Sequence, residues 1–233
     1  MALRVDILTL FPEFFEAFTT TSIVGRAVRD DRVEIHLTNI RDFATDRYGS
    51  VDDKPFGGGV GMVLMCQPIF DAVEHVRKLD SRPGKVILMT PQGRPADQPM
   101  VDGLALEERV ILIAGHYEGF DERIRQELVD LEISVGDFVL SGGEIPAMAL
   151  VDAMVRLLPG ALGKDESTTE ESFRDNLLEY PQYTRPAEYK GLGVPDVLLS
   201  GHHANIVAWR QEQAEQRTQE RRPDLWEKYK TSN

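Results

Sequence analysis

The sequence has one cysteine, no long apolar run and few bases for its number of acids. The single Cys66 excludes an internal disulfide framework and is typical of a reducing compartment. Its apolar neighbours, MVLMCQP, favour a buried thiol over a nucleophile. No apolar run reaches the roughly 18 residues that cross a bilayer, and the N-terminus has Asp6 inside its apolar part, unlike a secretory signal. These features predict a cytoplasmic protein with no membrane partner.

The shortage of bases also limits how the chain can bind nucleic acid. The formal net charge is −13, and a protein that coats nucleic acid non-specifically needs clustered lysine and arginine for its phosphate contacts. Whole-chain charge governs solubility and non-specific adhesion, so a local basic face remains compatible with this value.

Two nucleotide-binding signatures are missing as well. No G-x-G-x-x-G opens a helix, and no G-x-x-x-x-G-K-[ST] occurs, so the dinucleotide and P-loop interpretations lack their residues. The densest glycine stretch, DKPFGGGVGMVL at 53–64, follows Asp52 and has no Lys-Ser/Thr after it. We expect it to form a flexible loop near a substrate.

What the sequence does contain is an alternation of apolar β-rich runs and helical patterns. The near-continuous Val/Ile/Leu content of several runs is typical of strands covered on both faces, and the alternation predicts an α/β fold with a mostly parallel sheet. The predicted strands span 3–10, 32–40, 85–90, 109–115 and 131–140, and the predicted helices span 66–79, 120–130 and 144–159.

The last two helical patterns differ in character. The 120–130 segment is amphipathic and is expected at the surface. Residues 144–157 are apolar nearly all round, which predicts packing either in a core or in an oligomer interface.

The composition changes after Pro159. Residues 160–179 hold six acids and two bases among Gly, Ser and Thr, which is typical of a mobile linker. We therefore divide the chain into a domain over 1–160, a linker over 161–178 and a small helical domain over 179–233.

The predicted C-terminal domain ends in a polar helix that Pro223 interrupts or ends. Between Trp209 and Lys230 this segment carries six bases and five acids. That balance is explained equally well by a solvated helix face and by an RNA contact.

Three predicted strands run directly into glycine-bearing loops, at 89–94, 114–123 and 135–146. Ligands of open parallel sheets bind beyond the carboxyl ends of the strands, so the three loops predict a pocket. They offer backbone amides, apolar side chains and carboxylates, which suit a phosphate-free nucleoside with a positive charge. S-adenosylmethionine fits this description, because its sulfonium and ammonium groups favour a carboxylate such as Glu118 or Asp137.

Seven ordered motifs then make the chain similar to a known family. The chain resembles the bacterial tRNA (guanine-37-N1)-methyltransferases in the motifs VDDKPFGGGVGM, TPQGR, GHYEGFDER, SVGDFVLSGGEIPAM, RLLPGALG, ESF…LLEYPQYTRP and VLLSGHHANI…WR. The resemblance runs from LFPEFF to RRPDL and so covers nearly the whole chain.

The resemblance implies a SPOUT fold, in which the three loops form a deep trefoil knot at the C-terminal end of the α/β domain and bind S-adenosylmethionine. It also implies a homodimer with active sites at the subunit interface, which would give the apolar helix a partner surface. The implied cofactor site comprises Met89, Thr90, Pro91, Gln92, Gly115, Tyr117, Glu118, Gly119, Val135, Gly136, Asp137, Phe138, Val139, Leu140, Gly142, Gly143 and Pro146.

By the same resemblance, the methyl acceptor is N1 of the guanine 3′ of the tRNA anticodon. The family's general base is an acid in E-D-S-F, and Glu171 of TEESF stands at that position, a change from Asp to Glu. Glu170 and Asp175 are nearby alternatives. Arg156 of VRLLPG matches the family's catalytic arginine, which would stabilise negative charge on guanine O6.

The resemblance assigns the grip on the anticodon stem-loop to the C-terminal domain, with Tyr183, Arg185, His203, Trp209 and Arg210 as its expected contacts. The adjacent His202–His203 pair is a poor metal site, since no further ligands cluster nearby. The sequence shows no dedicated metal cage, and a Mg²⁺ requirement stays open. Two rival hypotheses are a SPOUT enzyme with another RNA target and a knotted RNA- or nucleoside-binding protein that has lost activity.

Overall fold

The structure, a computed structural model, describes residues 2–162 and 171–232. The chain divides into two compact units, Met1–Lys164 and Asp165–Asn233, and each is described by itself. The predicted linker crosses this boundary, and its residues 163–170 lie outside the described part, so its mobility stays a prediction.

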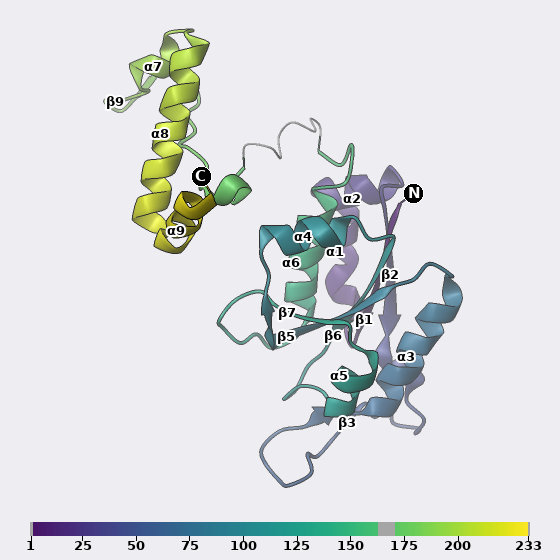
Figure 1. The fold of residues 1–233 in the computed structure, drawn as a ribbon. Coiled ribbons are helices and arrows are strands. Elements are labelled where there is room, and N and C mark those ends of the chain that lie inside the picture. The colour runs from purple at the N-terminus through teal and green to yellow at the C-terminus, as the bar shows by residue number, and fades with distance from the viewer. Residues whose placement is uncertain (1, 163–170, 233) are drawn as a thin grey trace. The chain divides into compact units, whose positions relative to one another are not determined.

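Unit 1 is built on a five-stranded sheet in the order β2-β1-β6-β5-β7, and every strand pair in it is parallel (Figure 1). This confirms the predicted α/β class with a parallel sheet, whereas the knot stays a prediction. The strands are β1 (Leu3–Thr9), β2 (Val33–Asn39), β5 (Lys85–Pro95), β6 (Arg109–Ala114) and β7 (Leu131–Ser134), and a separate short hairpin joins β3 (Asp52–Asp53) to β4 (Val63–Leu64).

Helices cover both faces of the sheet. They are α1 (Glu16–Thr20), α2 (Ser22–Arg29), α3 (Cys66–Leu79), α4 (Gln98–Ala105), α5 (Glu122–Leu128) and α6 (Glu144–Val155). One core packs α2, α4 and α6 against one face, and the other packs α3 and α5 against the opposite face. Consecutive residues of β5, such as Ile87 and Leu88, pack in different cores, because successive strand side chains point to opposite faces of the sheet.

The predicted helix over 66–79 is confirmed in full, but the predicted strand over 131–140 is wrong in its second half. β7 ends at Ser134. Beyond it, Gly136 N–H donates to Ser134 Oγ and Phe138 N–H donates to Gly136 O. These N–H groups form hydrogen bonds within a tight turn and do not pair with a neighbouring strand, so the apolar residues that follow lie in a loop.

Three short helices, α1, α2 and α4, had no predicted counterpart. α4 nevertheless has a clear start signal, because the Asp97 carboxylate accepts a hydrogen bond from Met100 N–H and a proline occupies the first turn. Its eight residues are too few for a helical period to stand out.

Unit 2 is a small, mainly helical domain. Its elements are η4 (Arg174–Asn176), β8 (Glu188–Tyr189), β9 (Leu192–Gly193), α7 (Asp196–Leu199), α8 (His203–Arg221) and α9 (Pro223–Ser232). Pro223 separates two helices and starts the second, where a missing N–H costs nothing. The segment that follows η4 is bonded to α8, since Leu178 N–H donates to the buried Thr218 Oγ1 at 2.8 Å.

Candidate active site

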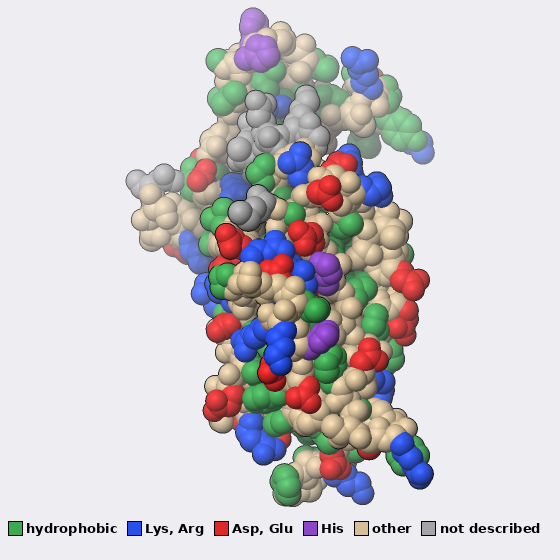
Figure 2. Space-filling model, turned by 90° about the vertical axis from the view of Figure 1, so that its right-hand side faces the viewer, with side chains coloured by type: hydrophobic (Ala, Val, Ile, Leu, Met, Phe, Trp, Pro, Cys, Tyr) green, Lys and Arg blue, Asp and Glu red, His purple; other side chains and the backbone are tan. Residues whose placement is uncertain are grey.

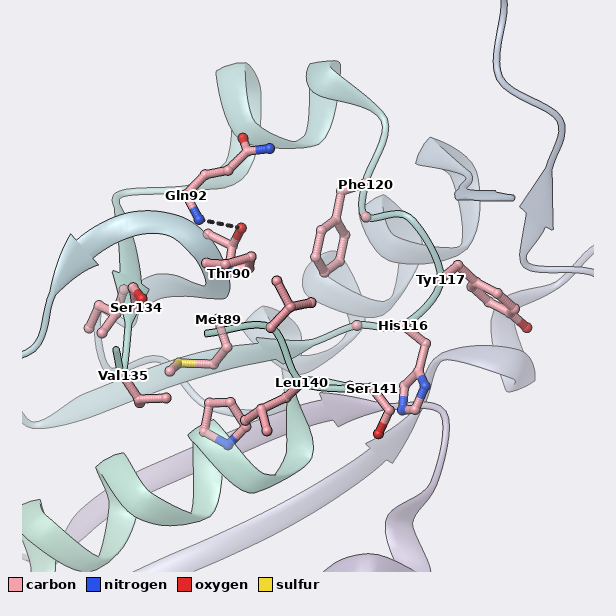
Figure 3. Close-up of a pocket in the computed structure, with 18 of the residues that line it drawn as sticks. Met89, Thr90, Gln92, His116, Tyr117, Phe120, Ser134, Val135, Leu140 and Ser141 are labelled. Carbon is pink, nitrogen blue, oxygen red and sulfur yellow. Dashed lines mark hydrogen bonds between the residues drawn. The ribbon is translucent and has the colours of Figure 1, made fainter. Parts of the chain in front are cut away.

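A pocket lies where an irregular stretch within β5 meets the loops after β6 and β7 (Figure 3). β5 pairs with Ile133 of β7 twice, through Met89 and again through Arg94, so the residues between them bulge out of the ladder toward the pocket. Sixteen of the seventeen residues expected to bind the cofactor line it; they are Met89, Thr90, Pro91, Gln92, Gly115, Tyr117, Glu118, Gly119, Val135, Gly136, Phe138, Val139, Leu140, Gly142, Gly143 and Pro146.

The one expected cofactor residue outside this lining is Asp137, whose side chain is exposed. Glu118 does line the pocket, and its backbone N–H donates to Met62 O at 3.0 Å. Its side chain packs on Gly61, where an added Cβ would lie 2.3 Å from Glu118 Cγ. The glycine-dense loop therefore borders the pocket, and Glu118 is the better placed of the two proposed carboxylates.

Six further residues line the pocket without having been singled out in the sequence: His116, Phe120, Arg125, Ile133, Ser134 and Ser141. His116 and Phe120 belong to the GHYEGFDER motif, and Ser134 and Ser141 border the other glycine loop, so the motifs carried a signal for them. Arg125 lies on α5 and carried none, because it reaches the pocket only through the packing of that helix.

The close approach of two backbone segments explains why residue 143 is a glycine. Gly143 N–H donates to Gly115 O at 2.8 Å, and a Cβ on Gly143 would lie 2.7 Å from Ala114 Cα. A side chain at this position would push the start of α6 away from the end of β6. Gly143 thus lets two of the three pocket loops touch.

The pocket offers no spare cation for a phosphate. Among the described residues that line it, the only lysine or arginine is Arg125. Its guanidinium pairs with Glu132, lies 3.6 Å from Glu122 Oε2 and donates to Thr90 Oγ1 at 3.4 Å. Two carboxylates therefore already balance this charge.

Cys66 is half-buried at the start of α3. Burial, together with a hydrogen bond to the Asp121 carboxylate, raises the pKa of its thiol. The Arg123 guanidinium, in turn, lowers the pKa of Asp121. Cys66 is therefore protonated at neutral pH, a poor state for a nucleophile.

Unit 2 has its own concave surface beside α8. Four of the five residues expected to bind substrate line this groove: Tyr183, Arg185, Trp209 and Arg210. The rings of Tyr183 and Trp209 are 6.4 Å apart, and the Arg210 guanidinium lies 4.6 Å from the centre of the Tyr180 ring. His203, the fifth, begins α8 and does not belong to the groove's lining.

The expected catalytic pair is divided between the units. Arg156 caps the C-terminal end of α6 in unit 1 and is half-buried. Glu171 lies in unit 2, where it lines a second pocket together with Asp175 and Arg210. The alternative base Glu170 lies outside the described residues.

On the face drawn in Figure 2, acidic and basic side chains are intermixed and form no large basic area. Within 2–162 and 171–232, no group of three His, Cys, Asp or Glu side chains is arranged to hold a metal ion. In the same residues, no helix is both long and apolar enough to cross a membrane.

Known proteins similar to this chain agree with the resemblance drawn from its motifs. Residues 3–228 match the family model described as tRNA (Guanine-1)-methyltransferase TrmD. A tRNA (guanine-N(1)-)-methyltransferase of Gloeobacter violaceus is 57% identical over 224 residues, covering 96% of this chain and 98% of the relative. Those of Brevibacillus brevis and Staphylococcus aureus are 55% and 52% identical, covering 97% and 99% of this chain and 92% and 94% of the relatives.

Proposed function

Because the chain belongs to the tRNA (guanine-1)-methyltransferase family and is thus a transferase that methylates N1 of guanine in tRNA, we propose that its methyl donor is S-adenosylmethionine and its acceptor is guanosine 37 of the anticodon loop. We place this reaction in the cytoplasm, where its tRNA substrate is found. The observation that carries the proposal is the pocket formed by the three loops of unit 1.

The lining of this pocket supports S-adenosylmethionine as the donor. When bound, the donor supplies an electrophilic methyl group on a sulfonium. Backbone groups of the three loops and apolar side chains such as Leu140 and Met89 suit an adenosine, and Glu118 supplies a negative charge for a cationic ligand. The paired state of Arg125 argues against a nucleotide phosphate in the same place.

Guanine N1 must lose a proton before it becomes a useful nucleophile. We assign this step to the Glu171 carboxylate as general base, with Arg156 stabilising the negative charge that moves to O6. Glutamate keeps the carboxylate of the family's aspartate and adds one methylene. Both assignments come from the motif match, and the Glu171→Gln substitution tests the first of them.

The groove of unit 2 supports a grip on the anticodon stem-loop. It combines the exposed ring of Tyr183 and the half-buried ring of Trp209 with arginines, the pairing that single-stranded RNA binders use to stack bases and hold phosphates. His203 keeps its proposed RNA contact, although the groove does not include it. A requirement for Mg²⁺ as a further cofactor is checked by adding EDTA to the methylation assay.

We also propose a homodimer. α6 buries Ala147, Leu150, Val151, Met154 and Val155 in the core of unit 1. It leaves Ile145 52% exposed, and Phe138 and Val139 in the preceding loop are 56% and 82% exposed. This apolar strip is suited to a second copy. Sedimentation velocity checks the proposal, since a monomer near 26.2 kDa would contradict it.

The activity itself is tested with labelled S-adenosylmethionine and two tRNA transcripts that carry G or A at position 37. Digestion should yield 1-methylguanosine from the first transcript and no label from the second. Equal labelling of both would contradict guanosine 37 as the acceptor. No label in either would favour a knotted RNA-binding protein without activity.

Replacing Trp209 with alanine should weaken tRNA binding. Base–aromatic stacking contributes about 1–3 kcal/mol per base, so the KM for tRNA is expected to rise about 5- to 150-fold, while the Kd of S-adenosylmethionine stays unchanged. Gln216→Ala, an exposed α8 position outside the groove's lining, is the matched control. An equal effect of the two substitutions would remove the groove from the proposal.

A further inference from the structure

A buried carboxylate lies directly behind the pocket wall. Glu144 is only 2% exposed although it begins α6. Its Oε1 accepts a hydrogen bond from Thr9 Oγ1 at 2.7 Å, and its Oε2 lies 2.8 Å from His116 Nε2. Three segments far apart in the sequence, the end of β1, the loop after β6 and the start of α6, therefore meet at this side chain.

These contacts fix where the His116 proton lies. Thr9 Oγ1 accepts from Phe11 N–H, so its own proton goes to Glu144. Glu144 occupies the first turn of a helix, where free N–H groups favour a negative charge. A carboxylate only accepts hydrogen bonds, so His116 Nε2 carries a proton and donates it to Glu144. In this tautomer Nδ1 has a lone pair and can accept a hydrogen bond.

The His116 ring is closely packed. The Phe11 ring meets it edge-on with the centroids 4.8 Å apart. A Cβ on Gly142 would lie 2.2 Å from His116 Nε2 and 2.5 Å from Glu144 Oε2. Glycine at position 142 therefore leaves room for the bond between His116 and Glu144.

The His116 side chain lies at the pocket. His116 is part of the pocket lining, its side chain is 20% exposed, and Figure 3 shows it next to Ser141. Within 2–162 and 171–232, Nδ1 has no hydrogen-bond partner. The cationic groups of the donor already have a carboxylate in the lining, Glu118. The Nδ1 acceptor is thus available to the base that enters the site.

Resting on the proposed function, we propose that His116 is a further catalytic-site residue that reads the target guanine through Nδ1, with Glu144 and Thr9 as positioning residues. Guanine carries two kinds of donor on its pairing edge, N1–H and the 2-amino group. N1–H is lost in the reaction, so Nδ1 accepts from the 2-amino group. His116, held by Glu144, thus selects guanine against a purine that lacks the 2-amino group.

The test compares transcripts with guanosine or inosine at position 37, because inosine keeps N1–H and O6 but has no 2-amino group. For the unaltered protein, kcat/KM should be about 10-fold higher with guanosine, the worth of one such hydrogen bond. His116→Gln retains an amide that can donate to Glu144 but has no atom at Nδ1. Its kcat/KM for guanosine should fall to the inosine value, and the ratio should approach one.

Glu144→Gln is the companion variant. Its amide can donate to His116 Nε2, which moves the ring proton to Nδ1 and removes the acceptor, so it too should lose the guanosine preference. A purely structural role would change the melting temperature but leave the guanosine-to-inosine ratio as it was. Melting temperature and the Kd of S-adenosylmethionine are measured for both variants.

The outcomes separate the two proposals. If the unaltered protein methylates neither transcript, the proposed function itself is wrong. If it methylates guanosine but His116→Gln keeps the guanosine preference, the function stands and the role of His116 is overturned. A loss of donor affinity in His116→Gln as large as the loss of kcat/KM would also overturn it, by assigning His116 to the donor.

Discussion

Replacing Glu171 with glutamine is expected to slow methyl transfer by about 10²- to 10⁴-fold, the usual contribution of a positioned general base. Glutamine keeps the size of the side chain but cannot take the N1 proton. Glu171 belongs to unit 2, whereas the proposed donor pocket belongs to unit 1. The Kd of S-adenosylmethionine should therefore stay within about twofold of the unaltered value. Single-turnover kinetics with saturating tRNA isolates the chemical step.

Asp175→Asn is the matched control for this prediction. Asp175 lines the same pocket as Glu171 and has a left-handed backbone with φ of 50°. Asparagine tolerates that conformation, so the substitution removes a charge without straining the chain. Its rate should remain near normal. The reverse pattern, with Asp175→Asn inactive and Glu171→Gln active, would transfer the role of base to Asp175.

Replacing Asp6 with alanine is expected to destabilise unit 1 by about 3–5 kcal/mol, because it leaves the buried Arg109 guanidinium without its carboxylate. Asp6 is fully buried on β1 and accepts from the Arg4 guanidinium at 2.7 Å and from Arg109 Nε at 2.7 Å. Arg109 is only 1% exposed, and its other nitrogens donate to the backbone carbonyls of Val76 and Asp80. No solvent can take over from the lost carboxylate.

Urea denaturation checks this, with an internal control in the position of the tryptophans. Both, Trp209 and Trp226, belong to unit 2. Asp6→Ala should lower the urea midpoint seen by far-UV circular dichroism and leave the tryptophan fluorescence transition in place. Lys78→Ala breaks only an exposed pair with Glu74 and should change stability by less than about 0.5 kcal/mol. A similar small change for Asp6→Ala would contradict the role of the buried network.

The local pattern predicted most of the fold of unit 1. The five sheet strands and α3 followed from runs of apolar residues and from a helical period, since both are properties of neighbouring residues. The error at 131–140 arose because the turn after Ser134 interrupts an apolar run without changing its composition. α1, α2 and α4 are too short for periodicity to reveal.

The pocket was predictable for a similar reason. Glycine-bearing loops that follow parallel strands must gather at one edge of the sheet, so their position in the chain indicated their position in space. What each charged residue does there was much less predictable. In the stretch SVGDFVLSGGEIPA, nothing in the sequence distinguishes the two carboxylates. In the structure, Asp137 is exposed and does not line the pocket, whereas Glu144 is buried behind the pocket wall.

By itself, then, the sequence determined the α/β class, the family and the loops that form the pocket, because strand alternation, ordered motifs and loop positions are all written along the chain. Only the tertiary structure showed that the Glu144 carboxylate contacts His116 and Thr9. Thr9 and Glu144 are 135 residues apart, and the pair forms only when β1, β6 and α6 pack together. Partners at such separation follow from burial and geometry in three dimensions, which no local pattern encodes.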